Sequence, residues 1–279
     1  MDKAGEPFWS EFWSKEKLPP PINLSGRGPR AWFYQEFHRL WQAHLPRAPL
    51  RTLRLLEVGC AQSRWLPYFA REWGFEIVGL DYSRLGCELA RAILAREGVT
   101  GEILHQDLFA AAPGLLGSFD AVFSNGVVEH FDDPAAALRQ MAAFLKPGGL
   151  LLTIVPNFSG WLGTLQGILG PEILDLHVPF RREDLAAAHL EAGLAVRFCD
   201  YLAFLHFSVL YPGKIWGKWG RQFMFKLLKG ATGLGALVRR LFREASPTRR
   251  TAGFIVCIAA KPPDQQGSAR LRTEQMVAG

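Results

Sequence analysis

The sequence has few cysteines, and no two of them are close together. Cys60, Cys87, Cys199 and Cys257 are the four, and none forms a CxxC pair. A zinc site of the ribbon type or a disulfide framework is therefore not expected, and no other metal-ligand motif stands out. We expect no metal centre, and the cysteine usage is typical of a reducing cytoplasm.

Long apolar runs are also absent. The longest uncharged stretch of the C-terminal half, residues 201–213, is too short to cross a bilayer. The opening MDKAGEPFWSEFW contains acids and no apolar core, so we expect no signal peptide. These features predict a cytoplasmic protein, with peripheral membrane attachment left open.

Acidic residues are scarce in one segment, residues 201–250. This segment has ten Lys or Arg against one acid, Glu244, which leaves +9, whereas 22 bases and 25 acids elsewhere leave −3. The basic character of the chain belongs to this segment. Its large apolar residues recur at helical spacing, which favours an anionic membrane surface, a lid over a hydrophobic pocket, or an ordinary helical subdomain.

The rest of the sequence predicts an α/β fold. Of 279 residues, 49% are apolar and 21% charged, as in a globular protein. From residue 53 onward, short apolar runs alternate with helical stretches, which predicts a parallel sheet covered on both faces. We divide the chain into an N-terminal helical lid (1–50), a core (51–200 plus 251–262), a basic apolar insertion (201–250) and a flexible tail (263–279).

Candidate binding residues follow successive predicted strands. Ligands of open α/β sheets bind at the carboxyl ends of the strands. Gly59 follows the first strand, Asp81 ends the second, Asp107 ends the third and Asn125 follows the fourth. A carboxylate at Asp81 could accept hydrogen bonds from a ribose diol, and Asp107 could accept one from an exocyclic amine.

Five segments occur in the order found in class I S-adenosylmethionine-dependent methyltransferases. They are LLEVGC, GLDYS, HQDLF, FDAVFSNGVVEH and LKPGGLLLTIVPN. The chain resembles this family over about residues 53–200 plus 251–261, and in particular its small-molecule, quinone-biosynthesis-like branch. The resemblance implies a Rossmann-like, seven-stranded, mostly parallel sheet with an antiparallel last strand, and the helical insertion would precede that strand.

The resemblance also implies roles for single residues. Glu57 would orient the loop or the methionine amino group, Gly59 would face the cofactor and Asp81 would hold the ribose. The adenine would lie between Asp107 and Leu108, and Asn125 would contact the methionine portion through its backbone. Ala61 and Tyr82, beside Gly59 and Asp81, complete the predicted cofactor-binding set.

The loop after the first strand departs from the family pattern. Ala61 and Ser63 stand where family members usually have further small residues, often glycine. S-adenosylmethionine has no pyrophosphate, so the loop need not form a close anion nest, and both residues fit if neither requires a positive φ. The same replacements count more heavily against a nicotinamide dehydrogenase.

Two histidines are candidates for the catalytic base. His130 follows the fourth strand and His177 lies in the loop after the fifth. An imidazole suits proton removal at neutral pH, although either residue could instead cap a helix or fix a lid. We predict methyl transfer to a hydrophobic or aromatic small molecule: a quinone, a lipid or a secondary metabolite.

Two other interpretations of the sequence are methylation of nucleic acid and binding without catalysis. Nucleic acid is not favoured, because SNGV stands where a base methyltransferase would have a motif such as NPPY. The alternative from another class is a non-catalytic protein that binds S-adenosylmethionine or another nucleoside and docks to a membrane or partner through residues 201–250. The acceptor atom and the oligomeric state are left open.

Overall fold

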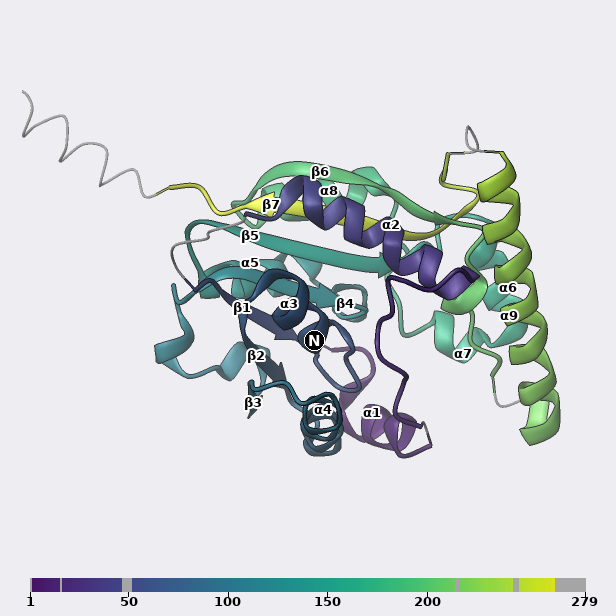
Figure 1. The fold of residues 1–279 in the computed structure, drawn as a ribbon, viewed down its shortest axis with the longest axis horizontal. Coiled ribbons are helices and arrows are strands. Elements are labelled where there is room, and N and C mark those ends of the chain that lie inside the picture. The colour runs from purple at the N-terminus through teal and green to yellow at the C-terminus, as the bar shows by residue number, and fades with distance from the viewer. Residues whose placement is uncertain (1, 16, 47–51, 214–215, 243–245, 264–279) are drawn as a thin grey trace, which may run out of the picture.

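The protein forms a single sheet with helices on both faces (Figure 1). The computed structural model describes residues 2–15, 17–46, 52–213, 216–242 and 246–263. The strands are β1 (Arg54–Val58), β2 (Glu76–Asp81), β3 (Glu102–His105), β4 (Phe119–Asn125), β5 (Leu145–Pro156), β6 (Ala195–Phe204) and β7 (Ala252–Ala260). Most of the tail that we expected to be flexible, residues 264–279, lies outside the described residues.

The helices fall between the strands and at the N-terminal side of the chain. The α-helices are α1 (Gly5–Ser14), α2 (Pro29–His44), α3 (Trp65–Trp73), α4 (Arg84–Glu97), α5 (Pro134–Phe144), α6 (Trp161–Leu169), α7 (Pro171–Leu174), α8 (Arg182–Glu191) and α9 (Gly217–Leu241). Short 3-10 turns are η1 (Leu108–Ala110), η2 (Pro113–Leu115), η3 (Val128–His130) and η4 (Phe207–Val209). None of the described helices is long and apolar enough to cross a membrane.

The strand order is β3-β2-β1-β4-β5-β7-β6. Strands β1 to β5 pair in parallel, and β7 runs antiparallel to both β5 and β6. The predicted seven-stranded sheet with an antiparallel last strand is confirmed. The order reverses between β1 and β4, which is where open α/β sheets bind their ligands.

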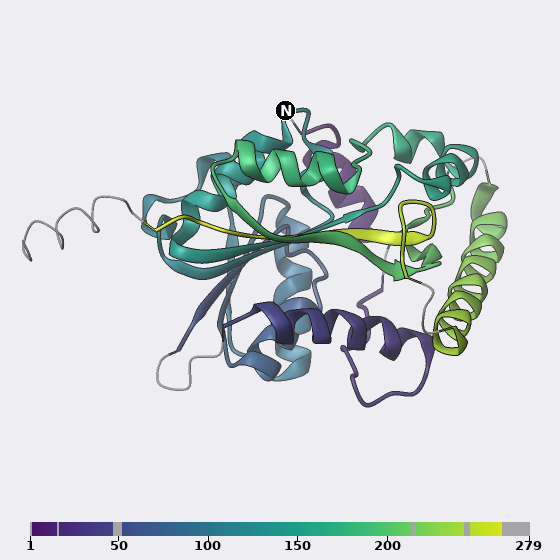
Figure 2. The ribbon, with the colours of Figure 1, turned by 90° about the horizontal axis from the view of Figure 1, so that it is seen from above.

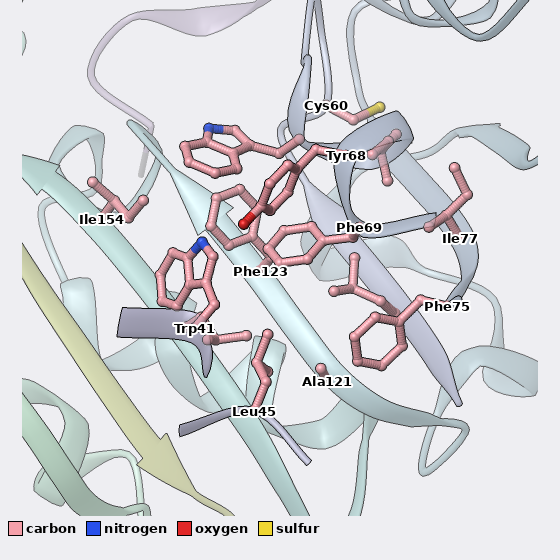
Figure 3. Packing of buried hydrophobic residues seen from close by; sticks show 14 of the residues in the cluster. Trp41, Leu45, Cys60, Tyr68, Phe69, Phe75, Ile77, Ala121, Phe123 and Ile154 are labelled. Atoms are coloured by element: carbon pink, nitrogen blue, oxygen red, sulfur yellow. The ribbon is translucent and has the colours of Figure 1, made fainter. Parts of the chain in front are cut away.

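Two apolar layers hold the helices to the sheet. Because successive strand residues point to opposite faces, Leu55 packs under α2, α3 and α4, while Leu56 packs under α5 and α8. Figure 2 shows these helix groups on opposite sides of the sheet. In the first layer, Trp41 of α2 and Phe69 of α3 both contact the ring of Phe123 on β4 (Figure 3).

Capping residues fix where the helices beside the carboxyl ends of the strands begin and end. Ser83 caps α4 by accepting a hydrogen bond from Gly86 N at 3.1 Å, and Gly98 ends α4 in the left-handed conformation at φ 63°. Asp133 caps α5 in the same way, with Pro134 at the first helical position. Consequently α4 and α5 start directly after β2 and the β4 loop.

Helix α9 lies apart from the layered core. Both views place it at the outer edge of the molecule (Figures 1 and 2). It corresponds to the predicted helical insertion between β6 and β7. Of its residues, Leu228 and Gly235 are buried, and they point back toward the protein.

Candidate functional site

The loop after β1 is held in place by Gly59. Its φ is +75°, and a Cβ there would lie 2.4 Å from Cγ2 of Val127 in the loop after β4. Gly59 is therefore required by packing between two loops as well as by its backbone conformation. The next positive φ falls at Gln62, at 50°, so neither Ala61 nor Ser63 needs one. The condition under which these two residues can replace glycine is met.

Glu57 is a buried carboxyl at the start of this loop. Ser63 Oγ donates to its Oε2 at 2.7 Å. Burial raises the pKa of Glu57 to about 8, the Ser63 hydrogen bond opposes this and the nearby Asp81 adds to it. An ammonium group bound against Glu57 would favour its ionised form. The carboxyl therefore fits the amino group of a methionine moiety.

Asp81 is fixed by two backbone hydrogen bonds at the end of β2. Its Oδ2 accepts from Ala61 N at 3.0 Å, and its Oδ1 accepts from Ser83 N at 2.8 Å. Burial raises its pKa, and these two bonds act against that rise. Each oxygen retains capacity for one more hydrogen bond. Two further donors, such as the hydroxyls of a ribose, match this geometry.

The remaining predicted cofactor residues surround the same opening. Asp107 accepts from Phe109 N at 2.7 Å and so begins η1, which places the buried Leu108 beside it. Asn125 is exposed at the end of β4. The Tyr82 hydroxyl donates to Asp2, whose carboxylate also accepts from the start of α1. This bond ties the N-terminal segment to the site.

His130 and His177 lie next to each other, with ring centroids 4.4 Å apart. Nδ1 of His130 is 2.8 Å from Leu176 O, and Nδ1 of His177 is 2.7 Å from Ile173 O. Because a carbonyl oxygen can only accept, each Nδ1 carries a hydrogen and each neutral ring has its lone pair on Nε2. Burial lowers the pKa of both rings, that of His177 to about 4 with help from His130.

Glu129 completes this corner of the site. It is buried, and burial raises its pKa to about 8. Its Oε2 has no hydrogen-bond partner among the residues that the structure describes. Glu129 is not among the predicted site residues, because an acid shortly before an Asp-Pro turn is commonly structural.

All ten predicted site residues line one cavity of about 1570 Å³. Nine of them form its polar end, at the carboxyl ends of β1, β2, β3 and β4, and His177 joins them from the segment after α7. The opposite walls are aromatic, and their main contributors, most of which sequence reasoning did not single out, are Trp9, Phe12, Phe33, Tyr34, Phe225 and Phe254. The aromatic spacing of the N-terminal helices was the available signal for these walls.

The apolar wall comes from segments that are distant in the sequence. Trp9 of α1 packs edge-on against His130 with centroids 5.0 Å apart, and Phe12 of the same helix contacts Tyr211. The α9 residues Phe225 and Leu228 line the cavity from the other side. Both the N-terminal helices and the basic insertion therefore contribute to one pocket.

Comparisons with known proteins agree with the family resemblance found in the sequence. A family model described as a methyltransferase domain matches residues 30–197, which is more than half of the chain. The chain is 29% identical over 166 residues to a ubiquinone biosynthesis O-methyltransferase of Pectobacterium atrosepticum, covering 56% of this chain and 67% of that one. It is 35% identical over 153 residues to the protein of the same name from Caulobacter vibrioides, covering 53% and 59%.

The chain thus spans about two thirds or less of these relatives' length. Among solved structures, geranyl diphosphate C-methyltransferase from Streptomyces coelicolor, in complex with Mg²⁺, geranyl diphosphate and S-adenosyl-L-homocysteine, matches with a TM-score of 0.56. That match covers 90% of this chain and 96% of the other at 16% identity, so it bears on the fold alone. With the family model, the sheet order and the order of the five sequence segments in agreement, the chain belongs to the methyltransferase domain family and has the fold of class I S-adenosylmethionine-dependent methyltransferases.

Proposed function

We propose that the protein transfers a methyl group from S-adenosylmethionine to a hydrophobic or aromatic small molecule. The observation that carries this proposal is the single cavity lined by all ten predicted residues. Ligand pockets usually measure about 300–1,000 Å³. A volume of about 1570 Å³ leaves room for a cofactor and an acceptor side by side.

The polar end of the cavity would hold the cofactor. Glu57 would accept from the methionine ammonium and Asp81 from the ribose diol, while Asp107 and Leu108 would flank the adenine. S-adenosylmethionine supplies a methyl group already activated on a sulfonium. The protein therefore needs mainly to align the acceptor in line with that methyl group and to exclude water.

The aromatic end would hold the acceptor. Trp9, Phe12, Phe33 and Phe225 form walls that suit a flat, apolar molecule. The names of the relatives, ubiquinone biosynthesis O-methyltransferases, support a quinone-like phenol ahead of a lipid or another secondary metabolite. The Nε2 atoms of His130 and His177 have unprotonated lone pairs, so either ring could take the proton of an acceptor hydroxyl.

Binding and turnover test this proposal separately. Calorimetric titration with S-adenosylhomocysteine should show one site per chain. Incubation with methyl-labelled S-adenosylmethionine and a catechol bearing a prenyl chain should then move label into the organic phase. Binding without transfer to this probe or to any component of a lipophilic extract would favour a non-catalytic binding protein, and absence of binding would refute the proposal outright.

We also propose that α9 attaches the protein to an anionic membrane surface. Its 25 residues include six Lys or Arg and no acid. One stripe of apolar side chains, between 44% and 83% exposed, runs along it: Trp219, Phe223, Leu227, Leu234, Leu237 and Leu241. These positions recur at intervals of three, four or seven, so they share one helix face.

This apolar stripe faces away from the protein. The buried positions of α9, Leu228 and Gly235, fall on the opposite face. Lys218, Lys226 and Arg240 follow the stripe along one edge, which is the arrangement of helices that lie in the headgroup region of a bilayer. Since Phe225 and Leu228 of the same helix line the cavity, a docked α9 would bring the acceptor pocket next to the lipid.

Vesicle binding tests the attachment. The protein should sediment with vesicles of phosphatidylcholine and phosphatidylglycerol, and much less with phosphatidylcholine alone. Equal sedimentation with both would exclude the electrostatic part of the proposal. A concentration-dependent dimer without vesicle binding would instead assign the stripe to a second copy of the chain.

A further inference from the structure

A third histidine, His206, lines the cavity at its aromatic end. It comes two residues after the end of β6. Because β5 and β6 both run antiparallel to β7, β6 ends at the same edge of the sheet as β4 and β5. In the strand order β6 lies three places from β4, and neighbouring strands are about 4.8 Å apart. The ends of β4 and β6 are therefore separated by a distance on the order of 14 Å, which sets His206 well away from the cofactor loops.

The imidazole of His206 is fixed on two sides. Its ring stacks on Phe33 of α2, with centroids 4.3 Å apart and an angle of 27° between the rings. Its Nδ1 lies 2.7 Å from Oγ of Ser208. Burial lowers the pKa of His206 to about 4, so the ring is neutral near pH 7. Phe33 and Ser208 line the same cavity, so this fixed imidazole forms part of its wall.

The second ring nitrogen of His206, Nε2, is available to a ligand. It has no hydrogen-bond partner among the residues that the structure describes, and it keeps accessible surface. A neutral imidazole donates through one nitrogen and accepts through the other, whereas a serine hydroxyl can do either. When Ser208 donates to Nδ1, Nε2 carries the hydrogen and donates, and when Ser208 accepts from Nδ1, Nε2 accepts. The two residues can therefore pair with a carbonyl, ether or hydroxyl oxygen.

The segment between β6 and η4, which carries this imidazole, is held in an unusual conformation. Ala203 has φ +61° and Leu205 has φ +47°, values that residues other than glycine seldom adopt. Leu205 N donates to Thr251 O at 2.7 Å, and Phe207 N donates to Oγ1 of Thr232 on α9 at 3.0 Å. Backbone strain persists only where the surroundings impose it, and it is frequent at ligand-binding sites. The position of the imidazole is thus fixed by both β7 and α9.

An unpaired polar atom in an aromatic wall discriminates between ligands. The side chains of Phe33, Phe225 and Phe254, which line this end of the cavity, offer no conventional hydrogen bond. An apolar ligand that displaces water from Nε2 of His206 leaves that nitrogen without a partner, which costs free energy. A ligand that brings an oxygen to Nε2 keeps the hydrogen bond. Sites of this kind reject analogues that lack the polar group.

We propose that His206, oriented by Ser208, selects acceptors with an oxygen substituent remote from the group that receives the methyl. This inference rests on the proposed function, because it names a feature of the acceptor. His130 and His177 face the group that receives the methyl, and His206 binds the oxygen at the other end of the molecule. His206 is thus a specificity-determining residue and does not act on the reacting atoms.

Two matched probes test the selection by binding alone. Each is a phenol with the same prenyl chain and carries, para to its hydroxyl, either a second hydroxyl or a methyl group of similar size. Protein saturated with S-adenosylhomocysteine is titrated with each probe under argon. The preference for the dihydroxy probe should be about tenfold larger in the wild-type protein than in His206→Phe. Comparing the two proteins cancels the difference in hydration between the probes.

The control variants separate recognition from packing. His206→Phe keeps an aromatic ring beside Phe33, and His206→Gln, whose amide both donates and accepts, should restore part of the preference. Phe254→Leu changes a ring that also contacts His206 and lines the cavity, so it should weaken both probes and leave their ratio unchanged.

Three results would overturn the proposal: an unchanged ratio in His206→Phe, an equal loss of preference in Phe254→Leu, or no binding of either probe to the wild-type protein. The first titration, with S-adenosylhomocysteine alone, reports separately on the proposed function.

Discussion

A Cβ built on Gly59 would lie 2.4 Å from Cγ2 of Val127. Gly59 belongs to the loop after β1 and Val127 to the loop after β4, so the two central strands of the sheet present loops that touch each other. This contact lies where the strand order reverses. The shape of the cofactor end of the cavity therefore depends on a glycine for two separate reasons, its φ of +75° and the nearness of Val127.

Gly59→Ala should destabilise the protein and weaken cofactor binding. A left-handed alanine costs about 1–2 kcal/mol, and the clash with Val127 adds to it. Gly98→Ala is the control, because Gly98 has φ +63° with nothing within 4 Å of an added Cβ. Urea unfolding should show a larger loss for Gly59→Ala than for Gly98→Ala, and Val127→Ala should narrow the difference in the double variant. Equal losses would mean that the contact is unimportant.

Asp81→Asn should weaken S-adenosylhomocysteine binding by about 10- to 100-fold, or roughly 1.4–2.7 kcal/mol. An amide has one acceptor oxygen, so its NH₂ group would face either Ala61 N or Ser83 N, and one ribose hydroxyl would lose its partner. Asp133→Asn is the matched control, since asparagine caps a helix as well as aspartate does and Asp133 caps α5. Calorimetry that finds equal affinities for both variants would contradict the assigned role of Asp81.

The order of strands and helices could be predicted because each element has its own local signal. Apolar runs mark β1, β2 and β4, Ser83 and Asp133 cap the helices that follow, and strand ends of a parallel sheet meet at one edge. The convergence of Asp81 and Asp107 on one cavity follows from that rule.

The cluster of Glu129 with His177 could not be predicted in this way. It depends on the path of the chain through α6 and α7, where no strand ends, and on one backbone bond between Val178 and Glu129. The outward direction of the apolar stripe on α9 was equally hidden, since periodicity gives a face but not what it faces. Both features arise from tertiary packing between segments that are remote in the sequence.

His189 should make the protein less stable in mild acid. It is fully buried, with Nδ1 near Leu185 O at 2.8 Å and Nε2 near Thr153 Oγ1 at 3.0 Å, and burial lowers its pKa from 6.5 to about 4. The unfolded chain therefore binds a proton more readily, and stability present above pH 6.5 is lost as the pH falls toward 4. From pH 7 to pH 5 this residue should remove about 2 kcal/mol.

Urea unfolding of the wild-type protein and His189→Gln measures that contribution. The difference in unfolding free energy between the two proteins should shrink by about 2 kcal/mol from pH 7 to pH 5. It should change by only about 0.1 kcal/mol from pH 7 to pH 8, where the imidazole is mostly neutral in both states. A difference that is the same at pH 5 and pH 7 would show that His189 is not held neutral.

Leu234→Ser with Leu241→Ser should release the protein from anionic vesicles without lowering its stability. Both side chains lie in the outward stripe of α9, 63% and 68% exposed, so the folded protein loses little packing when they are shortened. In the bilayer, a buried leucine side chain contributes about 1.5–3 kcal/mol, so the double variant should bind at least tenfold more weakly. Leu116→Ser with Leu190→Ser is the matched control, because these leucines are 49% and 60% exposed but lie outside α9.

The charges on α9 and its apolar stripe should make contributions to vesicle binding that differ in their dependence on salt concentration. Each Lys or Arg near an anionic surface contributes about 1 kcal/mol, which falls off within a Debye length. Lys218→Gln with Lys226→Gln should therefore weaken vesicle binding at low salt and converge on the wild-type affinity at about 1 M salt, where the Debye length is about 3 Å. The leucine double variant should remain weaker than the wild-type protein at both salt concentrations. If the charge variant and the leucine variant showed the same salt dependence, the charges and the apolar stripe of α9 would not contribute separately to vesicle binding. The proposal that α9 brings the acceptor pocket next to an anionic bilayer would then be contradicted.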